Sequence, residues 1–430
     1  MASTFDLTHL DRFAGSSTSI RRPREFTHFS YDDTHTLKPQ SAESLSYYYP
    51  PIFGAPGAQE YRPDLSAGFK AFRQRDDSPD EHLDGLLDTL QAYEESLLAR
   101  VKGGEDDVKI GNVRVKADVI TWRGMMTKVC PRMINFVNYA SLLGEMRMHA
   151  PMLFAILTVA FDDFSDFEMN ATCFQGTVFI EENHAYKAAQ RWIQNTQQSR
   201  RGEASQEMMQ YWGYKFETIS VLPGPWAECT RADIEARESY TVDNHPQYCS
   251  IVRTGIGTTS LVLAGEVDAV LGEKPENIDQ AIPWIELKTS AEPGNLAMPR
   301  EAVKYERKLL RYWAQSFLLG VPKIMVGYRT PDGFLTYIAE LETQRIPSQV
   351  KRGQRTWDGN VCINLTAAFL EFLKTTVVGE GVWRISRKRN GRAIKLVKVE
   401  ERGTGNVLKE GFKAHREHLR GLEVAAALRT

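Results

Sequence analysis

The sequence carries charged side chains at alternate positions in two otherwise apolar stretches. The first reads Gly-Glu-Val-Asp and contains Glu266 and Asp268, and the second reads Glu-Leu-Lys and contains Glu286 and Lys288. Side chains alternate between the two faces of a strand, so the members of each pair point the same way. We therefore expect two carboxylates on one strand face, and a carboxylate beside a lysine on another.

Glu217 adds a further carboxylate. It falls on the polar face of a third expected strand, 213–217. Four carboxylates at one strand rim raise each other's pKa unless a cation neutralises them, which indicates a divalent metal. Oxygen ligands favour Mg²⁺ or Mn²⁺ over zinc. Such an ion turns bound water into a nucleophile and holds a phosphate, while a neighbouring lysine stabilises the charge of the transition state.

A single Glu-x-Asp or Glu-x-Lys pair also occurs on the solvent face of an antiparallel strand. Here both pairs lie in strongly apolar strands, which favours a functional site. The apolar residues are Leu261, Val262, Leu263, Ile282, Trp284 and Ile285. The order Glu, Glu-x-Asp, Glu-x-Lys is similar to the metal-binding core of restriction-type nucleases. A DNA nuclease is thus one alternative, which digestion of duplex DNA but not RNA would support.

Other polar side chains have the spacing of a phosphate-binding surface. Lys308, Arg311 and Gln315 share one face of an expected long helix, since seven residues make two turns. This stripe suits a phosphate channel, and the solvated face of an amphipathic helix is the alternative. Arg123 follows Trp122 at the end of another β-like run, a pairing suited to phosphate contact or base stacking.

Taken in order, these motifs resemble the DXO family of decapping nucleases, from about residue 26 to about residue 399. The matching segments are 121–124 (TWRG), 213–217 (GYKFE), 265–268 (GEVD), 286–288 (ELK) and the helix with Lys308 and 313–317 (WAQSF). The resemblance implies that Glu217, Asp268, Glu286 and the carbonyl of Leu287 bind two Mg²⁺ or Mn²⁺ ions. It also implies that Glu266 acts through a metal-bound water.

The same resemblance assigns residues to the RNA. Arg123, Lys288 and Gln315 are expected at the phosphates, and Glu81, Trp122, Gly124 and Cys249 in the pocket for the first nucleotide. By itself Cys249 suits a small core residue. A basic residue of some relatives is replaced here by His35, which leaves that contact open.

Members of the family hydrolyse the bond after the first 5′ phosphate of RNA. They release pyrophosphate from triphosphorylated RNA, or remove an incomplete or NAD cap, and leave a 5′-monophosphate end for a processive 5′-to-3′ exoribonuclease. Fungal nuclear members also bind that exoribonuclease, so the nucleus is the expected location. The alternative is a mainly structural subunit that activates the exoribonuclease and has weak catalysis of its own.

Pro225 and Trp226 lie in a proline-braced segment, 222–226, that suits partner binding. A rigid turn that presents an indole is typical of an interface hot spot. Packing of the indole in a buried corner is the alternative.

The rest of the pattern predicts an α/β (α+β) fold, a single large domain with a central mixed sheet flanked by helices. Strands are expected at 215–221, 248–254, 260–271, 282–287, 323–328 and 333–341, and a hairpin at Asn390-Gly391. Helices are expected from Ser78 through Leu90, and at 300–319, 365–375 and 408–428. We divide the chain into a flexible arm (1–25), the catalytic domain (26–400) and a basic tail with a helical segment (401–430).

Composition restricts the function less than the motifs do. The chain is 42% hydrophobic and 25% charged, the balance of a soluble globular protein. Its formal net charge of −2 gives no overall attraction to a polyanion, so an RNA site must be a local basic patch. The five scattered cysteines indicate neither a disulfide framework nor a structural zinc site. No membrane segment is expected.

Overall fold

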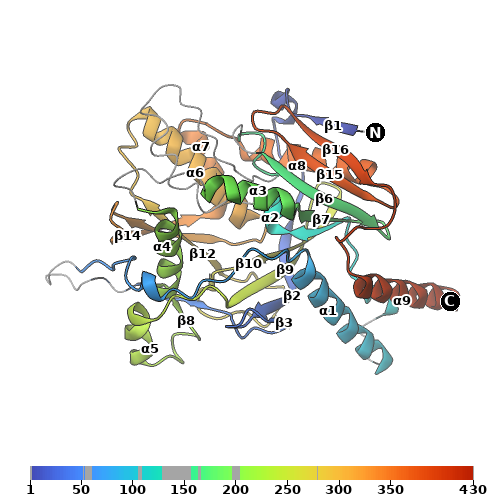
Figure 1. The fold of residues 1–430 in the computed structure, drawn as a ribbon, viewed down its shortest axis with the longest axis horizontal. Helices are drawn as coiled ribbons and strands as arrows, with labels where there is room; N and C mark the ends of the chain where they lie inside the picture. Colours follow the sequence, from blue (N-terminus) through green and yellow to red (C-terminus); the bar gives the residue numbers. More distant parts are fainter. Residues whose placement is uncertain are drawn as a thin grey trace.

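Two β-sheets flanked by helices make up the fold (Figure 1). The computed structural model describes residues 2–51, 53, 61–104, 109–127, 156–162, 166–195, 204–277 and 279–429. The expected mixed α/β architecture is confirmed, but its central sheet is divided into a ten-stranded and a six-stranded sheet.

The larger sheet contains strands from both ends of the chain. In spatial order they are β1 (Ala2–Asp6), β16 (Ala393–Glu400), β15 (Val382–Arg387), β6 (Phe167–Phe174), β7 (Thr177–Glu182), β5 (Val119–Trp122), β10 (Thr259–Glu266), β9 (Gln247–Ile256), β2 (Ile20–Tyr31) and β3 (Leu37–Pro39). The smaller sheet has the order β14 (Leu335–Glu342), β13 (Lys323–Arg329), β12 (Trp284–Ala291), β11 (Ala269–Val270), β4 (Tyr47–Tyr48) and β8 (Val221–Leu222).

The helices are α1 (Asp84–Lys102), α2 (Arg123–Thr127), α3 (His184–Asn195), α4 (Gln206–Ile219), α5 (Arg231–Ala236), α6 (Pro299–Phe317), α7 (Ile346–Arg352), α8 (Gly359–Thr376) and α9 (Glu410–Ala427). In the described part of the chain, none is both long and apolar enough to span a membrane.

The two sheets meet within one short segment of the chain. β10 ends in the larger sheet at Glu266, and β11 begins in the smaller sheet at Ala269. The single strand expected at 260–271 is therefore wrong, because the chain changes sheet at Val267 and Asp268. This junction places both acidic residues of the Glu-x-Asp pair where the sheets join.

Strand β12 is covered on both faces and open along part of one edge. Trp284 packs in the same core cluster as α6, whereas Ile285 and Leu287 pack with Trp212 and Phe216 of α4. β11 pairs only with the first two residues of β12. Side chains from α4, α6 and the sheet junction can therefore reach the β12 edge that follows.

The two ends of the chain are built into the fold. Residues 2–6 pair with β16 and residues 20–25 belong to β2, so the expectation of a flexible arm at 1–25 is wrong for these residues. Pairing satisfies their backbone hydrogen bonds, and Phe5 packs in the core. The expected C-terminal helix is α9, and it packs against α1 (Figure 1). The division of the chain into domains stays a prediction.

Two other expected elements differ from the structure. The helix expected from Ser78 begins at Asp84, although its apolar residues Leu83, Leu86, Leu87 and Leu90 are all buried. The strand expected at 215–221 is the end of helix α4 followed by the two-residue strand β8.

Candidate active site

Glu217 reaches the site from a helix and not from the strand expected at 213–217. Ser205 caps α4 by accepting a hydrogen bond from the Met208 amide, and Trp212, Phe216 and Ile219 form its buried face. This helical spacing places Glu217 near Asp268 and Lys288, whose charges shift its pKa. The expected strand is thus wrong, and the role of Glu217 stays a prediction.

Glu266 and Asp268 flank the buried Val267 at the sheet junction, as the alternation in the sequence predicts. Asp268 Oδ2 accepts a hydrogen bond from the Leu287 amide at 2.6 Å, which fixes the junction against β12. Gly265, which precedes the pair, leaves no room for a side chain. A Cβ there would lie 2.8 Å from Leu319 and 3.0 Å from the Cβ of Arg123. The missing side chain lets Arg123 approach.

Three donors converge on the carboxylate of Glu286, whose residue is only 1% exposed. Lys288 Nζ lies 2.5 Å from Oε1 and Gln315 Nε2 donates to the same oxygen at 2.5 Å. Arg123 Nη1 donates to Oε2 at 3.4 Å. Lys288 also lies 4.0 Å from Asp268 Oδ2. Residues from β12, α6 and the start of α2 therefore meet the sheet junction at one point.

The carboxylates of the site differ in their charge state. Burial, and then repulsion by Glu286, raise the pKa of Asp268 to about 7. Burial and then Asp268 raise the pKa of Glu217 well above its usual value. Glu266 is open to solvent on one side, but its enclosure by protein on the others raises its pKa. Burial also disfavours the charge on Glu286, yet Lys288 and Arg123 outweigh it and lower its pKa.

These carboxylates and the Leu287 carbonyl fit a hard divalent cation in chemistry. Burial, and then repulsion between carboxylates, raise the pKa of Glu217 and Asp268, and a cation would relieve that repulsion. In the described part of the chain, no three acidic, histidine or cysteine side chains are yet close enough to share one ion. Lys288 and Gln315 instead hold Glu286, so metal binding requires the side chains to reorient. The roles of the individual residues stay predictions.

A cavity of about 330 Å³ adjoins Glu266 and Arg123. Its walls include all four residues expected around the first nucleotide: Glu81, Trp122, Gly124 and Cys249. The Trp122 indole donates to the His82 carbonyl at 3.1 Å, and Arg75 holds Glu81 at 2.6 Å. The structure thus brings together side chains from residues 81 to 266 in one pocket.

Several residues of this pocket could not be predicted from the sequence. Arg75, His82 and His184 line it, and Lys187 does so from α3. His82 has a left-handed backbone (φ 45°) and contacts Glu181 at 2.9 Å. Arg75 and His82 come from loops, which have no recognisable spacing, whereas His184 and Lys187 both belong to α3. His35, whose role was left open, stacks on Tyr31 and lies 3.3 Å from Glu81.

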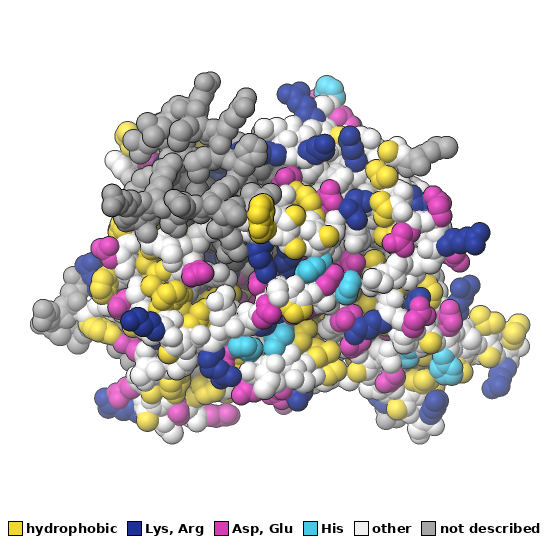
Figure 2. Space-filling view, in the orientation of Figure 1, with side chains coloured by type: hydrophobic (Ala, Val, Ile, Leu, Met, Phe, Trp, Pro, Cys, Tyr) yellow, Lys and Arg dark blue, Asp and Glu magenta, His cyan; other side chains and the backbone are white. Residues whose placement is uncertain are grey.

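The face of the molecule in Figure 2 shows basic, acidic and histidine side chains gathered around its hollowed centre. Basic and acidic side chains are mixed there, so this view shows no purely basic patch.

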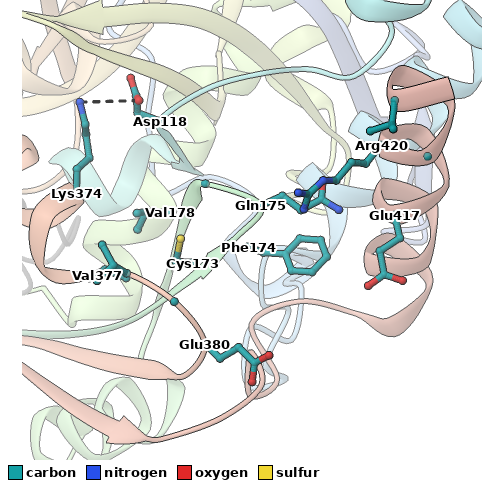
Figure 3. Close-up of a pocket in the computed structure, with 15 residues that line it drawn as sticks. Asp118, Cys173, Phe174, Gln175, Val178, Lys374, Val377, Glu380, Glu417 and Arg420 are labelled. Atoms are coloured by element: carbon teal, nitrogen blue, oxygen red, sulfur yellow. Dashed lines mark ion pairs between the residues drawn. The ribbon is translucent and has the colours of Figure 1, made fainter. Parts of the chain in front are cut away.

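Other cavities lie apart from these residues. A cavity of about 930 Å³ lies between α9 and the β6–β7 hairpin, with Lys374 and Asp118 paired at 3.8 Å on its wall (Figure 3). None of the predicted site residues lines it.

The segment expected at a partner interface, 222–226, begins in β8 and continues after it. Trp226 is 64% exposed, which excludes the buried-corner alternative for its indole. Whether Pro225 and Trp226 contact a partner stays a prediction.

Comparison with known proteins identifies the family of the chain. Residues 21–137 and 151–413 match the RAI1-like PD-(D/E)XK nuclease family. The chain belongs to that family. This confirms the family expected from the motifs.

Individual relatives extend the similarity over nearly the whole chain. A protein of Aspergillus fumigatus named decapping nuclease RAI1 is 47% identical over 410 residues, covering 95% of this chain and 97% of that one. A relative of the same name from Emericella nidulans is 47% identical over 414 residues, covering 96% and 98%. The crystal structure of Scheffersomyces stipitis Rai1 has a TM-score of 0.76 and 26% identity, covering 97% of this chain and 100% of that one.

Proposed function

We propose that this protein is a divalent-metal-dependent hydrolase of RNA 5′ ends, a decapping nuclease that leaves 5′-monophosphate RNA. Its substrates are 5′-triphosphate RNA and RNA with an incomplete or NAD cap. The observation that carries the proposal is that Lys288 lies between Glu286 and Asp268, with Glu217 near enough for their charges to shift its pKa, beside a cavity of about 330 Å³. The relatives' name, decapping nuclease, supports it.

Solved relatives support the ligand classes of the proposal. The Scheffersomyces stipitis Rai1 structure with (3′-NADP)⁺ and a calcium ion is 26% identical, with a TM-score of 0.75. That protein binds a dinucleotide and a divalent cation. In this chain we assign the cation, as two Mg²⁺ or Mn²⁺ ions, to Glu217, Asp268, Glu286 and the Leu287 carbonyl.

The bound cations supply Lewis acidity and activate water. Lys288, Arg123 and Gln315 point their donors at Glu286, so they already face the point where the attacked phosphate must lie. Lys288 and Arg123 then stabilise the charge that develops on the phosphate. Glu266, whose pKa is raised by burial, is placed to accept a proton. Trp122 forms a wall on which the first base can stack.

Mass analysis of three RNAs with triphosphate, unmethylated-cap and NAD-cap ends tests this function. With Mn²⁺ we expect pyrophosphate or an intact cap fragment, together with 5′-monophosphate RNA. Glu217→Gln and Asp268→Asn should each lower the rate by about a thousandfold or more, because each removes a charge from the metal site. Full activity in either variant, with the fold intact, would contradict the proposal.

The exposed Trp226 favours a second candidate function, a structural subunit of a nuclear 5′-to-3′ exoribonuclease. The two functions are compatible, and in the second the work of the chain is to stabilise its partner. Co-purification with the exoribonuclease distinguishes the structural function from the catalytic one. Trp226→Ala should weaken the complex, whereas Asp268→Asn should leave the complex intact. If Trp226→Ala binds like the wild type, this surface is not the interface.

A further inference from the structure

Lys308 lies in the same row of polar groups as the candidate metal site. On β12 the side chains of Glu286, Lys288 and Ser290 point to one face, since alternate residues of a strand share a face. Gln315 of α6 donates to Glu286, and Lys308, two turns earlier on the helix, donates to Ser290 Oγ at 2.6 Å. The row therefore continues beyond Lys288 and ends at a second ammonium group.

The charges around Lys308 differ from those around Lys288. Glu286 and Asp268 neutralise Lys288. Within the described ranges, no carboxylate lies at ion-pair distance from Lys308 Nζ. The groups that shift its pKa all disfavour its charge: burial first, then Arg329 and Arg311, which together lower the pKa to about 8. A buried cation without a counter-charge is costly, and an anionic ligand would relieve that cost.

The position of Lys308 indicates which anion it would bind. The first-nucleotide pocket adjoins Glu266 and Arg123, on the β10 side of Glu286. Ser290 lies four residues beyond Glu286, past the part of β12 that pairs with β11. Hence the attacked phosphate would lie between the first nucleotide on one side and Lys308 on the other.

We propose that Lys308 and Ser290 form a phosphate subsite for the leaving group, the diphosphate that departs from the 5′ end. This inference rests on the proposed function. A backbone phosphate farther along the RNA has the same chemistry, but the pocket places the RNA chain on the opposite side of Glu286. Lys308 would bind the β- or γ-phosphate of the substrate, hold it during cleavage and then release it as product.

Calorimetric titration with inorganic pyrophosphate, in the presence of Mn²⁺, tests the subsite without any RNA. Lys308→Met keeps the aliphatic stem and should weaken pyrophosphate binding by about tenfold or more, the usual effect of losing a charged hydrogen bond. Lys308→Arg should restore most of the affinity. Lys304→Met is the matched control: Lys304 lies on the same helix but pairs with Glu301 at 2.7 Å. It should bind pyrophosphate like the wild type.

A second titration, with 5′-monophosphate RNA, separates the two sources of phosphate. Lys308→Met should leave this product's affinity unchanged. Equal pyrophosphate affinity in wild type and Lys308→Met overturns the subsite, and so does weakening confined to the RNA product. Should Lys308→Met fail to fold, Lys308→Gln provides the same comparison. A wild-type protein that binds pyrophosphate through Lys308 but hydrolyses no RNA would contradict the proposed function and not the subsite.

Discussion

At the scale of single residues, the carboxylates of the site lower the stability of the metal-free protein. The pKa of Asp268 is about 7 in the folded protein, against 3.8 for an ordinary aspartate, so the folded state holds its proton more tightly than the unfolded state does. Stability of the metal-free protein therefore falls as pH rises from about 4 to about 7. The full penalty is present above that range.

Replacing Asp268 by Asn should remove this penalty. In EDTA at pH 8 we expect Asp268→Asn to increase the free energy of unfolding by on the order of 1–3 kcal/mol, although it removes activity. At about pH 3 or below the aspartate is protonated in both the folded and the unfolded state, so the difference should vanish. Urea unfolding at the two pH values measures this. A variant less stable than the wild type at pH 8 would show that the carboxylate is not strained.

Metal binding should also depend on pH. The protons that burial and mutual repulsion hold on Asp268 and Glu217 must leave before these groups bind a cation. Mn²⁺ affinity should therefore rise as pH increases through about 7, with protons released on binding. Calorimetry in buffers of different ionisation enthalpy measures the number released. Binding without proton release would contradict the assignment of these ligands.

At the scale of elements, the site depends on how α4 sits against the smaller sheet. Gly327 of β13 lies under Phe216, the neighbour of Glu217, and a Cβ at Gly327 would approach that ring to 2.6 Å. Gly327→Ala should destabilise the protein by about 1–3 kcal/mol and reduce the rate, because it displaces the helix that carries Glu217.

Gly213, on α4 itself, provides the matched control. A Cβ there would meet only Thr289 Oγ1, at 4.0 Å. Gly213→Ala should stabilise the protein by about 0.5–1 kcal/mol, since Ala favours a helix interior, and leave activity unchanged. Thermal unfolding and initial rates of both variants check the pair. If Gly327→Ala and Gly213→Ala changed stability and rate equally, the position of α4 would not depend on the contact between Phe216 and Gly327.

In this protein the alternation of charged side chains was predicted better than the elements that carry them. Alternation correctly identified the Glu-x-Asp and Glu-x-Lys pairs because both lie on or beside buried strands of the sheets. It failed for Glu217, where β-branched and aromatic residues suggested a strand and packing against Ile285 and Leu287 selected a helix. His82 and Arg75 could not be predicted, because only the folded chain brings their loops to the pocket.

At the scale of the whole molecule, a buried ion pair joins helix α1, near the start of the chain, to helix α9, near its end. Glu94 of α1 is fully buried and lies 3.0 Å from Arg416 of α9. It also accepts a hydrogen bond from the Val115 amide at 2.7 Å. Removing one partner of a buried pair leaves the other without a counter-charge.

Glu94→Ala should therefore destabilise the protein by about 3–5 kcal/mol and release α9. Hydrogen exchange should increase in α9 and the facing part of α1, while β10 and β12 keep their protection. Metal-dependent activity of the folded fraction should persist, because α9 carries none of the predicted site residues. Loss of protection throughout the molecule would instead show that α9 belongs to the cooperative core.

The most direct test of the account is Mn²⁺ binding to the wild type and to Asp268→Asn and Glu217→Gln, measured at pH 7.5 by calorimetry. If Glu217, Asp268 and Glu286 hold the cation together, each substitution should weaken binding by about tenfold or more. Lys304→Met should bind Mn²⁺ like the wild type. Unchanged Mn²⁺ affinity in both acidic-site variants would contradict a shared metal site at the sheet junction.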